Sequence, residues 1–240
     1  MTDDSSTGSP GRPADQPLID PTSKYPVEIP LQAQPAPGLA SELTPPADHG
    51  GTSYVGHGRL SERRAPVTGG DSGVGRALAI AYAREGADVA IGYLPSEQSD
   101  ADEVARLVRE AGRTCVLLPG DVGQEAVARG IVRDAVAGLG GIDVLVLNAA
   151  RQTYVENLED LTSEQWAETM NVNLSAPFWM TQEALGHLRP GASVIFTSSV
   201  QAYTPSPGLV DYATSRAGVN TMSKALAQQL APLGRQAGFA

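Results

Sequence analysis

Ser199, Tyr212 and Arg216 are side chains of the types that acid–base chemistry at an oxygen atom requires. Hydride transfer at a carbonyl carbon needs a proton donor, a hydrogen bond to the oxygen and a charge that favours ionisation of the donor. A phenol ordinarily ionises at about pH 10, so a neighbouring cation helps it to exchange a proton at neutral pH. Arg216 follows Tyr212 by four positions, and residues four apart share one face of a helix. The spacing predicts that the guanidinium lies one turn from the phenol.

A glycine-rich segment earlier in the chain has the composition of a phosphate-binding loop. Residues 68–75 read TGGDSGVG and lie between the apolar run 64–68 and the helical stretch 74–86. Phosphate groups bind to exposed backbone N–H groups at the positive end of a helix dipole. Glycines are needed because a Cβ atom would block the turn or the approach of a diphosphate. The segment therefore predicts a dinucleotide site at the start of a βαβ unit.

The elements that must position these groups alternate along the chain. Short apolar runs fall at 64–68, 88–93, 114–118, 142–147 and 193–197, and amphipathic stretches at 74–86, 99–111, 124–138, 163–188 and 209–233. Short apolar strands that alternate with helices are typical of a parallel sheet that is buried on both faces. The pattern predicts an α/β, doubly wound parallel-sheet domain of the Rossmann type.

The prolines divide the chain into two predicted regions. Ten of the 18 prolines lie in the first fifty residues. Residues 1–55 show no periodicity and are predicted to form an extended or disordered arm, in which the stretch 25–30 is compatible with polyproline-like structure. Residues 56–240 are predicted to form the dinucleotide-binding domain.

Composition excludes several other classes of function. The formal net charge is −10, and nucleic acids and anionic membranes bind clustered lysine and arginine instead. No apolar stretch approaches the ~20 residues of a membrane helix, and the N-terminus lacks the features of a signal peptide. The single cysteine, Cys115, lies in an apolar run and is predicted to be buried, and the three histidines are dispersed, so no metal site is expected. We expect a cytoplasmic protein.

The combination of motifs resembles the short-chain dehydrogenase/reductase family over residues 60–234. The motifs that carry this resemblance are TGGDSGVG at 68–75, the pairs Asp121-Val122 and Asn148-Ala149, and the single residues Asn173, Ser199 and Tyr212. The segments PPADHG at 45–50 and GGDSG at 69–73 are also similar to a bacterial stress-associated branch with an N-terminal extension. The resemblance implies an oxidoreductase that uses NADP or NAD on a small alcohol or carbonyl substrate (aldehyde or ketone) and forms a homo-oligomer, generally a tetramer.

The resemblance also implies a role for each motif residue. Tyr212 would be the acid/base, Ser199 would bind the substrate oxygen, Asn173 would hold a relay water, and Arg216 would supply the charge. The adenine would lie beside Asp121 and Val122, and its ribose beside Asn148 and Ala149. The full set expected to bind the cofactor is Gly69, Asp71, Ser72, Gly73, Val74, Gly75, Tyr93, Asp121, Val122, Asn148 and Ala149.

The choice between NAD and NADP stays open at this point. An acid at the end of the second strand would bind the ribose 2′-hydroxyl of NAD, and an arginine would bind the 2′-phosphate of NADP. The second strand run ends with Tyr93, Leu94 and Pro95 and has neither. The missing carboxylate slightly favours NADP, with Arg76 as a hypothetical partner of the phosphate.

Three substitutions depart from the family pattern. Arg216 replaces the lysine of the YxxxK motif, and the larger, planar guanidinium is expected to lower activity severely. Pro66 lies within the first strand and removes a backbone donor there, which is expected to weaken the strand. Leu147 replaces an asparagine and is expected to cost a hydrogen bond between neighbouring strands.

The C-terminal end is the fourth departure. The sequence stops at Ala240, and residues 234–240 show no strand pattern, so we expect the domain to lack its last strands. The run 193–197 would then form an apolar sheet edge, which invites pairing with another chain. Two alternatives follow from these departures: a catalytically impaired dinucleotide-binding protein, or a fragment without independent function.

Overall fold

The computed structural model describes residues 20, 23 and 28–240. Gln34–Ala240 form one compact unit. The expectation of an extended or disordered arm over 1–19, 21–22 and 24–27 lies outside the described residues, as does the first half of the polyproline-like stretch 25–30. The predicted division of the chain near residue 55 stays a prediction.

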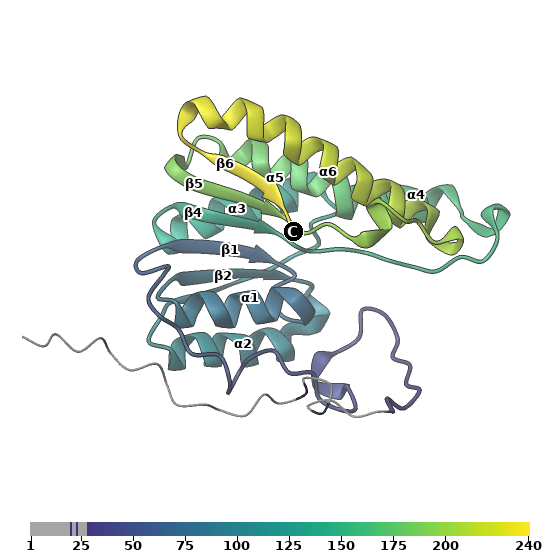
Figure 1. Cartoon of the computed structure of the whole chain (residues 1–240), viewed down its shortest axis with the longest axis horizontal. Coiled ribbons are helices and arrows are strands. Elements are labelled where there is room, and N and C mark those ends of the chain that lie inside the picture. Colours follow the sequence, from purple (N-terminus) through teal and green to yellow (C-terminus); the bar gives the residue numbers. More distant parts are fainter. Residues whose placement is uncertain (1–19, 21–22, 24–27) are drawn as a thin grey trace, which may run out of the picture. The chain divides into compact units, whose positions relative to one another are not determined.

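The unit is built on a parallel sheet of six strands, in the order β3-β2-β1-β4-β5-β6 (Figure 1). The strands are β1 (Arg64–Thr68), β2 (Asp88–Tyr93), β3 (Cys115–Pro119), β4 (Ile142–Leu147), β5 (Leu188–Phe196) and β6 (Gln236–Phe239). The order reverses direction between β1 and β4, as in a doubly wound fold. This confirms the predicted fold class.

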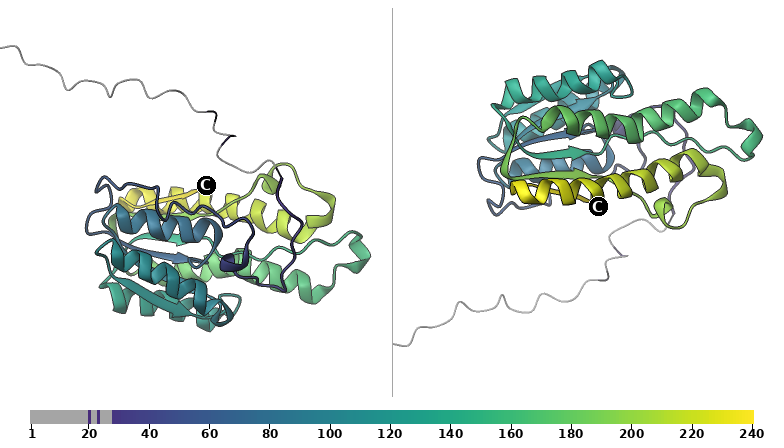
Figure 2. Two further views of the ribbon diagram at one scale, coloured as in Figure 1. Left: turned by 90° about the horizontal axis from the view of Figure 1, so that it is seen from below. Right: turned by 90° about the horizontal axis from the view of Figure 1, so that it is seen from above.

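Helices cover both faces of this sheet, as the two views of Figure 2 show. The helices are α1 (Gly73–Arg84), α2 (Gln98–Glu110), α3 (Glu125–Leu139), α4 (Ser163–Met170), α5 (Ala176–Ala184) and α6 (Val210–Leu230). One core cluster joins α1 and α2 to the sheet, through residues such as Ala79 and Val104. A second cluster joins α3, α5 and α6 to the other face, through Val132, Met180 and Val219. The predicted stretch 163–188 is two helices joined by a π-helical turn, η5 (Asn171–Ser175).

Pro66 lies inside β1, which is nevertheless formed in full. Residues two apart in a strand direct their N–H groups to the same neighbour, and the Arg64 N–H donates to a carboxylate oxygen of Asp143 in β4. The Pro66 nitrogen therefore faces β4. Five residue pairs join β1 to β2, whereas Val67–Val146 alone joins β1 to β4. The proline thus thins the ladder on one side only.

The expectation that residues 234–240 contain no strand is wrong. Gln236–Phe239 form β6, which pairs in parallel with Ser193–Phe196 of β5, and the Ser198 N–H donates to the Ala240 carbonyl at 2.7 Å. The expected exposure of β5 as a sheet edge is therefore also wrong. Four residues are too few for a readable alternation, and the pairing arises because α6 and its final turn return the chain alongside β5.

Residues 34–59 of the predicted arm make specific contacts within the compact unit. The buried carboxylate of Glu85, at the end of α1, accepts hydrogen bonds from the Tyr54 hydroxyl, the His57 N–H and both the N–H and the guanidinium of Arg59. The Arg59 hydrogen bond is the main reason why the pKa of Glu85 lies far below its usual range. At the start of α2, Asp100 accepts from the N–H groups of residues 40 and 41.

Two further features of the described residues concern surface and core. Cys115 is buried as predicted, and burial raises the pKa of its thiol to about 11.

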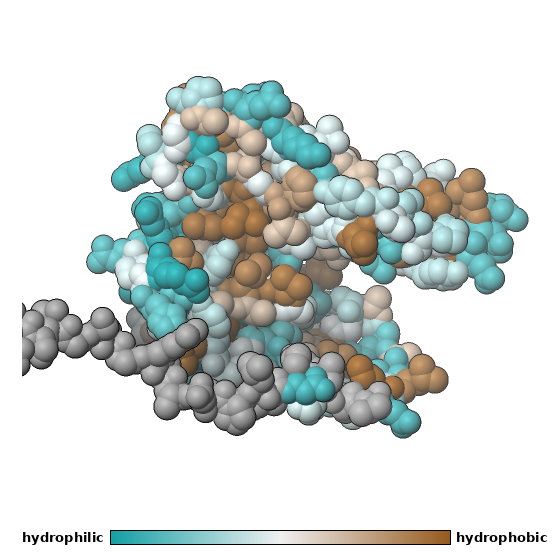
Figure 3. Space-filling model, in the orientation of Figure 1, coloured by the Kyte–Doolittle hydropathy of each residue, from teal (hydrophilic) through white to brown (hydrophobic). Residues whose placement is uncertain are grey.

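No helix among the described residues is long and apolar enough to cross a membrane. Apolar side chains gather over β4 and β5 on the face shown in Figure 3.

Candidate active site

A cavity of about 680 Å³ opens at the carboxyl ends of the strands. Its walls come from the segments that follow β1, β2, β3, β4 and β5, and from the first turns of α6. Ligands of doubly wound proteins bind at this edge, where the strand order reverses. The cavity brings together the predicted residues Gly69, Asp71, Ser72, Gly73, Val74, Tyr93, Asp121, Val122, Asn148, Ala149, Tyr212 and Arg216.

The glycine-rich loop has the geometry of a phosphate cradle. Gly69 and Gly73 have φ angles of +60° and +50°, in the left-handed region that favours glycine. A Cβ atom on Gly75 would lie 1.8 Å from the Gly69 carbonyl oxygen, so position 75 must be glycine for the loop to close on α1. Around the ideal Cβ position of Gly73 there is open space. Helix α1 begins at Gly73, so its first N–H groups are available at the cavity.

Thr68, Asn148 and Thr197 join the ends of three strands beneath the cavity. The Thr68 hydroxyl accepts from the N–H groups of Asn148 and Ala149, at 2.9 and 3.0 Å. The Asn148 side chain donates to the Thr68 and Gly69 carbonyls and accepts from the Thr197 hydroxyl. These contacts fix the loop where the β1–β4 ladder is thin. Leu147, which precedes them, is buried in the core, and its carbonyl accepts from the Thr197 N–H.

The end of the cavity beside β2 carries two buried carboxylates. Asp71 is 1% exposed, and its Oδ2 atom has no hydrogen-bond partner. Glu97, in the short turn η3 (Pro95–Glu97), is 9% exposed and accepts from the Leu94 N–H at 3.2 Å. Burial, and next the charge of Asp71, raise the pKa of Glu97 to about 7. Burial is also the main cause of the raised pKa of Asp71.

Sequence reasoning missed Glu97 because it considered only the residues that end the second strand. Tyr93, which does end β2, lines the cavity and donates from its hydroxyl to Gln98 at 2.7 Å. The η3 turn brings Glu97, four residues later, back to the same wall. Arg76, the hypothetical partner of a 2′-phosphate, is not among the described residues that line the cavity.

Tyr212 and Arg216 lie together at the α6 end of the cavity, as their spacing predicted. The Arg216 Cζ atom lies 5.0 Å from the centre of the Tyr212 ring. Arg216 is 2% exposed, and its Nη1 atom donates to the Thr197 carbonyl at 2.9 Å. Its buried Nε atom has no partner. The guanidinium is therefore held over the ring face and anchored to the end of β5.

Asp211 fixes the turn that carries Tyr212, and sequence reasoning missed it. Its carboxylate is buried and accepts from the Tyr212 N–H and from the Thr169 hydroxyl of α4, both at 2.7 Å. A carboxylate is also favourable at the positive end of α6. An aspartate immediately before a predicted catalytic tyrosine at a helix start is the sequence signal that would have found it.

Asn173 and Ser199 lie beside the cavity and are not among the described residues that line it. The buried Asn173 amide donates to the Arg151 carbonyl and to the Ser215 hydroxyl, and its oxygen accepts from the Arg151 N–H at 2.7 Å. Ser215 in turn donates to the Tyr212 carbonyl. Ser199 caps the short turn after β5, where its hydroxyl accepts from the Gln201 N–H at 3.2 Å.

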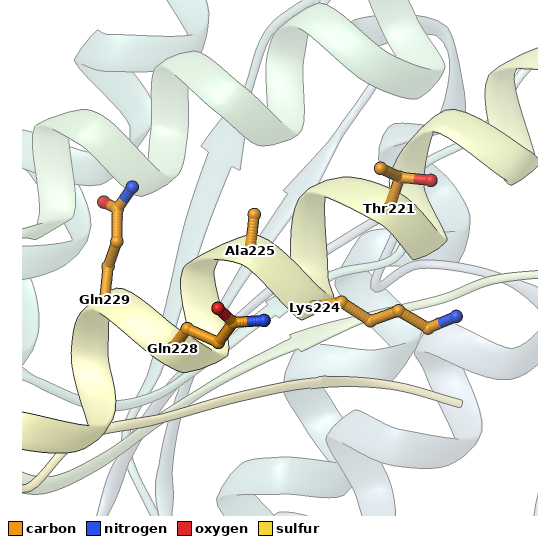
Figure 4. A pocket seen from close by; sticks show the side chains of 5 residues that line it. All are labelled: Thr221, Lys224, Ala225, Gln228 and Gln229. Carbon is orange, nitrogen blue, oxygen red and sulfur yellow. The ribbon is translucent and has the colours of Figure 1, made fainter.

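A second hollow of about 500 Å³ lies on the outer side of α6. Its lining side chains, drawn in Figure 4, all come from that helix: Thr221, Lys224, Ala225, Gln228 and Gln229. It includes neither the glycine-rich loop nor the tyrosine, so the chemistry belongs to the larger cavity.

Comparison with known proteins agrees with this geometry. Residues 63–234 match the family model described as short chain dehydrogenase. An Escherichia coli K12 protein named uncharacterized oxidoreductase YghA is 53% identical over 218 residues, covering 90% of this chain and 74% of its own. General stress protein 39 of Bacillus subtilis is 40% identical over 209 residues, covering 87% of this chain and 73% of its own.

A solved structure is similar in fold as well. The crystal structure of a short-chain dehydrogenase from Burkholderia cenocepacia, in complex with NADP, superposes with a TM-score of 0.73 at 35% identity. The match covers 75% of this chain and 74% of that one. By sequence and by fold, the chain belongs to the short-chain dehydrogenase family of oxidoreductases.

Proposed function

We propose that this chain is an NAD(P)-dependent oxidoreductase that interconverts an alcohol and an aldehyde or ketone. The observation that carries the proposal is that one cavity joins the phosphate cradle at Gly69–Gly73 to the paired Tyr212 and Arg216. The first feature suits a dinucleotide, and the second suits proton exchange with an oxygen atom.

The cofactor would be held along the edge of the sheet. The backbone of the loop and the start of α1 would bind the diphosphate, Asp121 and Val122 would border the adenine, and Asn148 and Ala149 the adjacent ribose. The positive φ angles of the loop glycines and the unpartnered Asp71 Oδ2 atom are compatible with such a ligand. When bound, the nicotinamide supplies or accepts the hydride.

Tyr212 would exchange the proton with the substrate oxygen. The Arg216 guanidinium lies 5.0 Å from the ring centre and places a positive charge next to the tyrosine. By the family resemblance, Ser199 would donate the hydrogen bond to the substrate oxygen. Asn173 would act through its contacts with Arg151 and Ser215, which hold the loop after β4 against the α6 turn that carries Tyr212.

The experiment is to assay alcohols with NAD and NADP, and aldehydes and ketones with NADH and NADPH, in the wild-type chain and two variants. Tyr212→Phe removes the proton donor and is expected to lower kcat at least about a hundredfold, because general acid catalysis contributes on that scale. Arg216→Lys is expected to raise kcat, because a compact ammonium group bonds more readily to a ribose than a guanidinium anchored on Thr197.

Two outcomes would contradict the proposal. One is turnover in Tyr212→Phe equal to that of the wild-type chain. The other is an absence of turnover in both the wild-type chain and Arg216→Lys while the cofactors still bind, which would favour a dinucleotide-binding protein without catalysis.

Small-molecule alcohols and carbonyls are the proposed substrates, and a homo-oligomer is the proposed assembly.

A further inference from the structure

We propose that Asp71 and Glu97 make this site select NAD(H) against NADP(H). The inference rests on the proposed function and reverses the slight preference for NADP that the end of the second strand suggests. In dinucleotide-binding folds, an acidic side chain that follows the second strand binds the ribose hydroxyls of NAD and repels a 2′-phosphate. Here the carboxylates come from the glycine-rich loop and from η3 instead.

The position of the two carboxylates is the first support. Both line the cavity beside Tyr93 and Leu94, at the carboxyl end of β2, and the adjoining wall contains Asp121. A diphosphate at the glycine-rich loop would extend its adenosine toward these residues, because β2 and β3 lie on this side of β1. Asp71 and Glu97 therefore border the space that the adenine ribose would fill.

The unpartnered oxygen of Asp71 is the second, independent support. Asp71 is 1% exposed, and its Oδ2 atom has no hydrogen-bond partner. Buried carboxylate oxygens without a partner are costly, so a ligand donor is expected at this atom. A ribose hydroxyl can donate a hydrogen bond, whereas a phosphate dianion can only accept one.

The balance of charge is the third support. Among the described residues that line the cavity, the cations are Arg151, in the segment after β4, and Arg216, in α6. Neither comes from the β2 side. Behind the wall, Asp100 adds negative charge, which contributes to the raised pKa values of both Asp71 and Glu97. Arg76 of α1 acts on Asp71 in the opposite direction, and its effect is smaller than that of Asp100. A 2′-phosphate would add two negative charges beside Asp71, Glu97 and Asp100, where the existing carboxylates already repel one another.

The test is equilibrium binding of NADH and NADPH, followed by nicotinamide fluorescence, in the wild-type chain, Glu97→Gln and Asp71→Asn. The amide of Glu97→Gln can still accept from the Leu94 N–H, so the turn is preserved. We expect the wild-type chain to bind NADH at least about tenfold more tightly than NADPH, which is the scale of a like-charge contact at a partly screened site. Each variant should lower the ratio of the NADPH dissociation constant to the NADH dissociation constant at least about fivefold, mainly by tighter binding of NADPH.

Glu110→Gln is the matched control, because it removes one charge from the exposed C-terminal end of α2, the helix that follows η3, and Glu110 does not line the cavity. It should leave the ratio unchanged. A second readout, competition by 5′-ADP and by 2′,5′-ADP, tests the adenosine end alone, and the wild-type chain should prefer the former.

The outcomes separate this inference from the proposed function. Equal or tighter binding of NADPH to the wild-type chain, or variants that shift both affinities equally, would overturn the inference and leave the proposed function intact. Failure of the folded wild-type chain to bind either dinucleotide would overturn both. If Asp71→Asn does not fold, Glu97→Gln and the two adenosine fragments still decide the question.

Discussion

At the scale of single residues, Tyr212 and Arg216 share one face of α6, whereas Glu97 lies in the three-residue turn η3. A helix fixes the relation between Tyr212 and Arg216, because four positions return to the same face. The contact of the Arg216 guanidinium with the Thr197 carbonyl depends instead on how β5 meets α6. Glu97 reaches the cavity only through the η3 turn, and a three-residue turn leaves no periodic pattern to read.

The raised pKa of Glu97 predicts a pH-dependent cost in stability. An acid whose pKa is about 7 in the folded chain and near its ordinary value of 4.5 in the unfolded chain stabilises the fold below pH 4.5, and this contribution is lost as the pH rises through 7. Asp71, Asp100 and the Leu94 N–H are the groups that act on it. We therefore expect Glu97→Gln to be more stable than the wild-type chain at pH 8, by at most ~3 kcal/mol, and to lose that advantage near pH 5.

Denaturant unfolding at pH 5 and pH 8 measures this difference. The control is Glu110→Gln, whose carboxylate is exposed at the end of α2. It should follow the wild-type pH profile. Parallel profiles for the wild-type chain and Glu97→Gln would show that Glu97 is ionised at no cost, which would contradict the prediction.

At the scale of elements, the strands that the sequence predicted are those with continuous apolar runs, and β6 was missed because it has none. The sequence Gln236–Phe239 becomes a strand only beside β5, so tertiary pairing and not local propensity creates it. Pro66 shows the converse. Proline is unfavourable within a central strand, yet β1 forms because its β2 side and the side chains of Thr68 and Asn148 hold it in place.

Replacing Pro66 by valine should therefore stabilise the sheet. The new N–H would face β4, where Val67–Val146 is the sole β1–β4 pair, and a ladder hydrogen bond is worth about 0.5–1.5 kcal/mol. Pro119→Val is the matched control. The Gly120 N–H donates to the Tyr93 carbonyl of β2, so the nitrogen of Pro119 faces away from β2 and a new N–H would gain no ladder partner.

Chemical denaturation of both variants isolates the contribution of the new ladder hydrogen bond. Loss of a proline makes the unfolded backbone more flexible by the same amount in both variants, so this effect cancels when their free energies of unfolding are compared. The free energy of unfolding should be higher for Pro66→Val than for Pro119→Val by about 1 kcal/mol. A value that is equal or lower for Pro66→Val would show that β1 is already optimal with proline.

At the scale of the whole molecule, the doubly wound topology was predictable because strands and helices alternate regularly from residue 64 onward. Residues 34–59 carry no such pattern. Their contacts with Glu85 and Asp100 depend on single carboxylates at the ends of α1 and α2. Ala36 and Pro37 from this segment also line the cavity. The cavity is thus lined by segments from most of the described chain, so it can form only when most of the fold has formed.

We propose that the cavity at the carboxyl ends of the strands is a dinucleotide site, and titration of the purified chain with NADH is the most direct test of that proposal. The nicotinamide fluorescence should change saturably with one site per chain, because the Gly69–Gly73 cradle and its supporting Thr68–Asn148 contacts are already formed. An absence of binding to protein that is folded and monodisperse would contradict the claim, because the loop would then resemble a phosphate site without acting as one.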